Sequence, residues 1–218
     1  MDDIKSDITL YLYKIGKNKK FLISCLILLY LVFLPLIIQN SIKDVTDNIF
    51  SEILCFSCME RYIYVVFIII TVFFNREYID KRYYEIILSM DKSKRLRHYL
   101  WAFLLFNFVM IPFYLILYLY IPGIIKYFFL VFLQEIFLIS FFYVISTITN
   151  NLIISEGGVI FYILFFSFFD NSASIFNIFL FEESIIYISN INYVYLKILL
   201  ISLLFLLIGL FIEGTRKM

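Results

Sequence analysis

The stretch YLWAFLLFNFVMIPFYLILYLYI, residues 99–121, decides the fold because it contains no charged residue. A bilayer core about 30 Å thick needs about 20 apolar residues at a rise of 1.5 Å each, so this stretch can span it as a helix. Backbone groups inside lipid must bond within their own segment, which favours helices over strands. The sequence therefore predicts an all-α membrane protein with six transmembrane helices. The other five blocks are Phe21–Ile38, Cys55–Phe74, Tyr127–Thr149, Leu152–Phe169 and Leu196–Ile212.

Composition supports this class. The chain is 63% hydrophobic and 16% charged, far from the mixture typical of a soluble domain. With so much of its length in apolar blocks, no room is left for a soluble domain of ordinary size. We therefore expect a single transmembrane domain over residues 1–218, with membrane lipid among its partners and no nucleic acid.

Basic residues are concentrated in alternate gaps between the blocks. Fourteen lie before the first block, between the second and third, or after the last, against four elsewhere. By the positive-inside rule, this asymmetry predicts that both termini are cytoplasmic. The four exceptions, counted with the outer gaps, are Lys43, Arg61, Lys126 and Lys197.

Residues 1–20 carry an apolar pattern of their own. Ile4, Ile8, Leu12 and Ile15 recur at helical spacing, and lysines gather toward the end of the segment. This pattern predicts an amphipathic helix in the inner headgroup layer, with its lysines facing anionic lipid. The alternative is a solvated basic leader.

The segment 76–98 is longer than a simple connector between antiparallel helices. It is charged, yet apolar residues recur along it, which predicts a short cytoplasmic helix that docks a soluble partner. The alternative is a basic loop that serves only as a topology signal. Within this segment, EIILSMDKSKR at 85–95 resembles the E-L-L-L-S-x-P-x-S-R stretch that follows the second span in ABC-2 type membrane subunits of ABC exporters. Asp91 stands where that family has proline.

The resemblance implies a permease subunit that works with a partner ATPase. Glu77, just upstream, resembles the acidic residue that opens the coupling segment in the family. The chain has no phosphate-binding loop G-x-x-x-x-G-K-[ST], so ATP and Mg would be bound by a separate cytoplasmic ABC ATPase. A second copy of the chain, or a similar permease subunit, would complete the transporter. The expected coupling residues are Glu77, Glu85, Ser89, Asp91, Ser93, Lys94 and Arg95.

Polar residues inside spans are costly and therefore informative. Gln134 and Glu135 lie about a third of the way into the fourth block, and Asn107 lies in the third. We interpret these three residues as candidates for a substrate pathway, with Glu135 as the only acid well inside a span and far from the cytoplasmic side. Alternatively, Glu135 pairs with a basic group such as Lys126, or it lies at the outer headgroups. Asn107 would otherwise serve as an interhelical hydrogen-bond donor.

The remaining features are structural expectations. The segment 170–195 is apolar for an outer loop and lacks Lys and Arg up to Asn192, so we expect short helices that dip into the outer leaflet. Cys55 and Cys58 form an isolated C-x-x-C near the outer end of the second block, where packing is favoured over a zinc site or a disulfide. Among the glycines, Gly157–Gly158 is the expected point of close helix approach.

Enzyme chemistry is not indicated. Glu182–Glu183 is similar to the glutamate pair of intramembrane CAAX-type proteases, but no arginine follows at the required spacing. The sequence instead predicts the membrane subunit of an ATP-driven ABC-2 type exporter of amphipathic or antimicrobial peptides, in a Gram-positive plasma membrane. The alternative is a small transporter independent of an ATPase, or an immunity protein that acts by binding.

Overall fold

The structure is a computed structural model, and every element that it describes is a helix. It describes the backbone of residues 13, 16–17, 19–42, 48–79, 95–168, 178–179 and 191–215, and no strand occurs among them. Five helical stretches are long and apolar enough to cross a membrane. The elements are α2 (Lys19–Ile27), the π-helix η1 (Leu28–Phe33), α3 (Leu34–Ile42), α4 (Asn48–Ile79), α6 (Arg95–Tyr120), the 3-10 helix η2 (Pro122–Ile124), α7 (Ile125–Thr149), α8 (Leu152–Phe168) and α10 (Ile191–Thr215).

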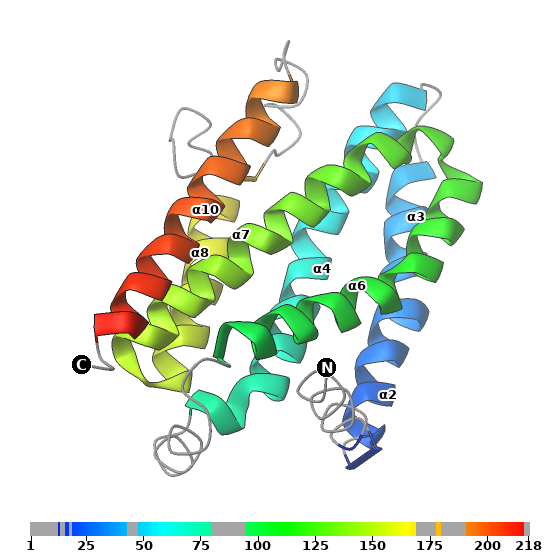
Figure 1. Cartoon of the computed structure of the whole chain (residues 1–218). Coiled ribbons are helices and arrows are strands. Elements are labelled where there is room, and N and C mark those ends of the chain that lie inside the picture. Colours follow the sequence, from blue (N-terminus) through cyan, green and yellow to red (C-terminus); the bar gives the residue numbers. More distant parts are fainter. Residues whose placement is uncertain are drawn as a thin grey trace, which may run out of the picture.

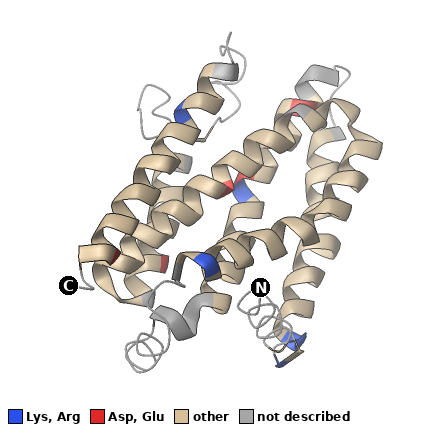
Figure 2. Ribbon diagram, in the orientation of Figure 1, with Lys and Arg blue, Asp and Glu red and all other residues tan. Residues whose placement is uncertain are grey.

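Successive helices run back and forth through one bundle (Figure 1). The beginning of α2, the end of α4, the beginning of α6 and the end of α10 all lie at the same end of the bundle. α4 and α7 occupy the centre, and two thirds of the apolar part of each is buried, whereas α10 and the α2–α3 stretch are much more exposed. Most of the described ribbon carries no charge, as Figure 2 shows.

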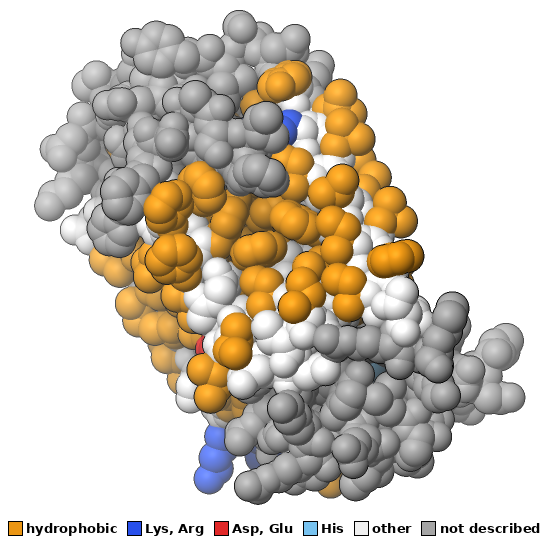
Figure 3. All heavy atoms as spheres, turned by 90° about the vertical axis from the view of Figure 1, so that its left-hand side faces the viewer, with side chains coloured by type: hydrophobic (Ala, Val, Ile, Leu, Met, Phe, Trp, Pro, Cys, Tyr) orange, Lys and Arg blue, Asp and Glu red, His pale blue; other side chains and the backbone are white. Residues whose placement is uncertain are grey.

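The exposed surface of the bundle is apolar. Figure 3 shows hydrophobic side chains over much of the described surface on the side where α8 and α10 lie. Leu200, Leu204, Leu207 and Phe211 of α10 are all exposed there or nearby on the same helix. A soluble protein would not leave so continuous an apolar surface in water, so this exposure agrees with a multi-pass membrane protein.

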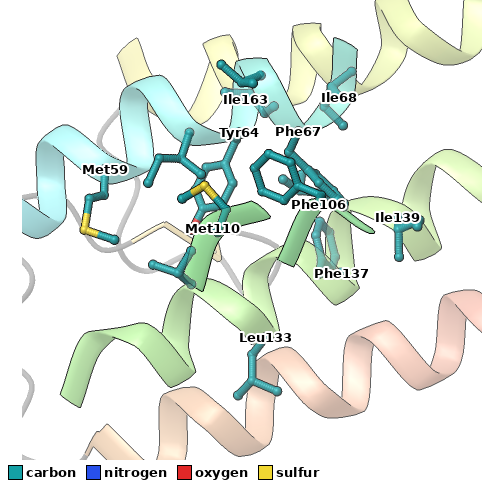
Figure 4. Close-up of a cluster of buried hydrophobic side chains, with 14 of the residues drawn as sticks. Met59, Tyr64, Phe67, Ile68, Phe106, Met110, Leu133, Phe137, Ile139 and Ile163 are labelled. Carbon is teal, nitrogen blue, oxygen red and sulfur yellow. The ribbon is translucent and has the colours of Figure 1, made fainter. Parts of the chain in front are cut away.

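Aromatic side chains fill the space between the helices. Tyr64 and Phe67 of α4 point toward Phe106 and Met110 of α6 in the centre of the bundle (Figure 4). The rings of Phe67 and Phe106 lie 5.0 Å apart, centroid to centroid, within the range of favourable aromatic pairs. Aromatic rings rather than small residues therefore fill this part of the core.

The turns between α6, α7 and α8 follow from their residues. α6 ends at Tyr120, two residues before Pro122, because the residue that precedes a proline is disfavoured in the helical conformation and Ile121 is not helical. α7 ends at Thr149, and the next residue, Asn150, adopts the left-handed conformation with φ 47° and donates its N–H to the carbonyl of Ser146. Asn151 then caps α8, because its Oδ1 accepts hydrogen bonds from the N–H groups of Ile153 (2.9 Å) and Ile154 (3.3 Å).

The first apolar stretch is one continuous helix with a wider turn in its middle. The π-helical turn Leu28–Phe33 ends just before Pro35, and the N–H of Leu34 bonds the carbonyl of Leu29 five residues earlier. A proline ring clashes with the preceding turn of a regular α-helix, and a π-turn relieves such strain. The wider turn beside Pro35 is therefore a local rearrangement that accommodates the proline.

A close helix approach occurs at a glycine that was not expected. A Cβ at Gly209 of α10 would lie 2.5 Å from the ring of Tyr143 of α7, so these two helices need a glycine there. A Cβ at Gly157 would meet nothing within 4 Å, whereas one at Gly158 would lie 3.0 Å from Ile145 of α7, which is also a tight contact. The expectation that Gly157–Gly158 is the only candidate is wrong, because sequence alone does not reveal which helices pack together.

One further expectation is corrected by a helix boundary. Arg61 was counted with the outer gaps, but it lies well inside α4, where its side chain is exposed. In the segment 170–195, which was expected to be an outer element, α10 begins at Ile191. Ile178 and Phe179, the only described residues before it in this segment, are non-helical and buried in the core. Most of residues 1–20, where an amphipathic helix was expected, and most of the coupling segment 76–98 lie outside the described residues.

Candidate functional site

Polar side chains meet in the middle of the bundle, where α4, α6 and α7 come together. Glu60 lies about 14 Å along the helix from Ser51, the start of the apolar part of α4, at 1.5 Å per residue. Glu135 lies about 12 Å along α7 from Tyr127 by the same measure. Both helices run in the same direction through the bundle (Figure 1), so the two acids lie at a similar depth. Both are almost fully buried.

Gln134 is held on the α4 side of α7 by three hydrogen bonds. Its Nε2 donates to Glu60 Oε1 (2.5 Å) and to the carbonyl of Ile178 (2.7 Å). Its Oε1 accepts a hydrogen bond from the hydroxyl of Tyr64. Glu60 and Tyr64 are four residues apart on α4 and therefore project from the same face. Gln134 thus joins α4, α7 and the segment at Ile178, and we define Glu60, Tyr64 and Gln134 as the glutamine network.

Glu135 faces the other way, because consecutive residues of a helix project about 100° apart. Its Oε2 accepts a hydrogen bond of 2.8 Å from Nδ2 of Asn107 on α6. Among the described residues, its Oε1 has no hydrogen-bond partner although that atom is buried. A carboxylate oxygen without a partner in a low-dielectric interior is costly and marks a place where a positive group or a proton would be stabilised.

The three expected pathway residues are therefore close together but bonded differently. Asn107 and Glu135 contact each other directly, and Gln134 belongs to the glutamine network. Two alternatives for Glu135 do not fit. It is fully buried within α7 and does not lie at a helix end, and Lys126 is about 13 Å away along the helix.

Sequence reasoning missed Glu60 and Tyr64. The prediction that Glu135 is the only acid well inside a span is wrong, because Glu60 is only 2% exposed within α4. The signal was present, since Glu60 lies inside the predicted block Cys55–Phe74. Tyr64 gave no signal of its own because tyrosines are common throughout the chain.

The expected coupling residues lie at one end of the bundle, so far as they are described. Glu77 is in the last turn of α4 and Arg95 is the first residue of α6. Their side chains, and residues Glu85, Ser89, Asp91, Ser93 and Lys94 altogether, lie outside what the structure describes.

The other polar features have structural explanations. Cys55 is buried in the hydrophobic core, as expected of a packing residue. Within the described ranges, no group of three or more His, Cys, Asp and Glu side chains is arranged to hold a metal ion. Near the end of α7, the hydroxyl of Tyr143 donates to Glu213 of α10, and that of Tyr99 donates to Ser146 Oγ over 2.8 Å.

Comparison of the chain with protein-family models, with curated proteins and with solved structures finds no match in any of the three.

Proposed function

We propose that this chain is the membrane-spanning subunit of an ATP-driven ABC-2 type exporter, with six spans and both termini in the cytoplasm. The observation that carries the proposal is the arrangement of the basic segments. The beginning of α2, the end of α4, the beginning of α6 and the end of α10 lie at one end of the bundle (Figure 1), and the sequence segments rich in Lys and Arg adjoin these helix ends. α8, with 17 residues, is at the lower limit of a spanning helix and would be the sixth span.

The length of α4 supports a docking role for the segment that follows it. A helix of 32 residues is about 48 Å long, which exceeds a hydrocarbon core of about 30 Å by roughly three turns. The last turns of α4, including Glu77, would then extend beyond the membrane toward the ATPase. In this proposal, residues 77–97 transmit closure of the ATPase pair to α4 and α6, and ATP and Mg are bound by that partner.

The buried polar residues support a substrate pathway through the bundle. Asn107, Gln134 and Glu135 lie inside spans, where polar side chains commonly mark the route of a substrate. The aromatic surroundings suit a substrate with an apolar face, such as an amphipathic or antimicrobial peptide. A second copy of the chain, or a similar subunit, would complete the route in a Gram-positive plasma membrane.

The experiment for the topology is labelling of single cysteines from outside intact cells, in a chain whose native cysteines have been replaced. Cysteines at Asp44 and Ser172 should react with an impermeant reagent, and a cysteine at Lys94 should react only after the membrane is opened. Labelling of the Lys94 position from outside would overturn the orientation.

The experiment for coupling combines Glu85→Lys, Lys94→Glu and Arg95→Glu in one variant. A single surface ion pair contributes at most about 1 kcal/mol, so the triple change is the fair test. It should abolish co-purification of the ATPase and ATP-dependent export while insertion stays intact. The control is the double reversal Arg216→Glu and Lys217→Glu, which alters basic charge in another segment. Unchanged co-purification and export in the triple variant would rule out the docking role.

A second candidate is a transporter that needs no ATPase, or an immunity protein that acts by binding. The observation in its favour is the presence of two buried carboxyl groups, Glu60 and Glu135, at similar depth, since such groups serve as proton relays in ion-coupled transporters. Uptake or efflux by the purified chain in liposomes, driven only by an imposed pH gradient, would favour this candidate. Transport that requires ATP and the ATPase would favour the first.

A further inference from the structure

A groove of about 590 Å³ lies between α6 and α7 on the outside of the bundle. Its walls are apolar and largely aromatic, with Phe108 of α6 and Phe129 of α7 exposed at 74% and 54%. Its volume is within the range of small-molecule sites. Because these side chains face the lipid, a ligand dissolved in the membrane reaches the groove without passing through water. We call this feature the α6–α7 groove.

Asn107 is the one amide among the residues that line the α6–α7 groove. Its Nδ2 donates to the carbonyl of Phe103 (3.1 Å) and to Glu135 Oε2 (2.8 Å). The Phe103 carbonyl can only accept, which fixes the orientation of the amide, because an oxygen in place of Nδ2 would meet another acceptor there. Both amide hydrogens are therefore occupied, and Oδ1 is what Asn107 can offer to a ligand. This oxygen makes no hydrogen bond to any described residue.

Glu135 lies directly behind this amide and determines which charge the site prefers in a ligand. Its Oε1 is buried and lacks a hydrogen bond within the described part of the chain. Donation from an amide to an acceptor strengthens the carbonyl of the same amide as an acceptor, because hydrogen bonds in a chain polarise one another. A bound ammonium group would stabilise the ionised form of Glu135, and the ionised carboxylate behind the acceptor attracts a positively charged donor and repels an anion.

We propose that the α6–α7 groove binds an apolar ligand that carries an ammonium group, with its N–H donated to Asn107 Oδ1 in front of Glu135 and its apolar part along Phe108 and Phe129. The inference rests on the proposed function, because it names the chemical class that such an exporter would collect from the membrane. An amphipathic peptide with a lysine side chain or a free amino terminus belongs to this class.

The site lies at the depth of the acyl chains, and a phospholipid headgroup carries a phosphate whose negative charge an ionised Glu135 would repel. Asn107 lies about 16 Å along α6 from Leu96 and about 20 Å from Tyr120, so it is near the middle of the span. Headgroups stay at the surface of the bilayer. Exposed aromatic rings near the middle of a span add favourable cation–π contacts to a bound ammonium, which acyl chains cannot exploit.

The only tryptophan of the chain can report binding. Trp101 is on α6, one turn before Leu104 at the edge of the groove. The purified chain in zwitterionic lipid nanodiscs would be titrated with three bromine-labelled alkyl probes of equal length, which end in a primary ammonium, a trimethylammonium or a carboxylate. Quenching of Trp101 fluorescence measures occupancy of the groove, and the carboxylate probe measures partition into lipid.

The ammonium probe should reach half-quenching at a concentration about tenfold lower than the carboxylate probe, as expected for one charge-assisted hydrogen bond. The trimethylammonium probe should be weaker than the primary ammonium because it has no donor. Equal quenching by all three probes, or by the two cationic probes, would overturn the proposal.

Variants then locate the site. Glu135→Gln keeps the shape and removes the charge, so the preference for ammonium over carboxylate should be lost. Phe108→Ala should weaken binding, whereas Phe211→Ala, a matched control on α10 with a similarly exposed ring at 72%, should not. Size-exclusion profiles and helix content establish that each variant is folded. If a variant is not folded, the comparison of the three probes on the parent chain still tests the proposal. An unchanged preference in Glu135→Gln would also overturn the proposal.

The ATPase is absent from these titrations. A groove that binds ammonium in a chain that captures no ATPase would leave this inference standing and remove the proposed exporter function. If the chain captures an ATPase but the groove shows no preference for ammonium, the proposed exporter function stands and the proposed ligand class is rejected.

Discussion

Gln134 and Glu135 are adjacent in α7, but they differ in how completely their side chains are hydrogen-bonded. On the side that faces α4, all three hydrogen bonds of Gln134 end on described partners, and the network includes the carboxyl group of Glu60. On the side that faces α6, Glu135 has a single hydrogen bond, from Asn107, and a buried oxygen without one among the described residues. The two residues are equally buried, so burial does not distinguish them.

The difference indicates distinct roles. A saturated network in a low-dielectric interior fixes the relative position of the elements that it joins, and its loss leaves several buried groups unsatisfied. A buried carboxyl group that lacks a hydrogen-bond partner instead lowers the stability of the bundle until a ligand or a proton binds to it. We therefore assign the glutamine network to structure and the Asn107–Glu135 pair to binding.

The largest effect is expected for Gln134→Leu. The change leaves Glu60 Oε1, the Tyr64 hydroxyl and the Ile178 carbonyl without their partner, so the free energy of unfolding should fall by about 3 kcal/mol or more. Denaturant titration of the purified chain in detergent micelles measures it. Ser140→Ala is the control on the same helix, because its hydroxyl bonds only the Ile136 carbonyl one turn earlier. A loss below 1 kcal/mol in Gln134→Leu would contradict the structural role of the network.

An intermediate effect is expected on the third side of α7, where α10 packs against it. Gly209→Ala forces a methyl group against the ring of Tyr143 and should lower the free energy of unfolding by about 1 to 3 kcal/mol. Gly157→Ala is the matched control, since a methyl group there enters open space. The same titration compares the two, and the contact at Gly209 would be disproved by equal stability of both variants.

The smallest effect, and one of opposite sign, is expected for Glu135→Leu. Replacing a buried carboxyl group that lacks a full set of partners should raise the free energy of unfolding by about 1 kcal/mol. Binding of the ammonium probe should be lost in the same variant, so stability and binding change in opposite directions. A loss of stability greater than 1 kcal/mol would show that Glu135 has a structural role like that of Gln134, and the comparison between the two sides would fail.

Much of this architecture could be predicted from the sequence. Each long apolar block forms a helix in the structure. A long stretch with few charged residues is stable only in lipid or in a packed core, and such stretches can be recognised in the sequence. Block Leu152–Phe169 gave a helix shorter than the five spanning candidates, and the helix ends moved by several residues, most visibly at α4 and α10. These ends depend on caps and contacts outside the apolar stretch, to which hydropathy is insensitive.

The sequence by itself determined that the chain is helical and apolar, where its basic segments lie, and that Asn107, Gln134 and Glu135 are polar residues inside spans. Only the tertiary structure decided that Gln134 is saturated while Glu135 is not, that Glu60 and Tyr64 belong with Gln134, and that Gly209 rather than Gly157 admits a neighbouring helix. The physical reason is that hydropathy is a property of one segment, whereas a hydrogen bond or a close contact requires two. The partner of each buried group comes from a helix distant in the sequence, and only packing selects it.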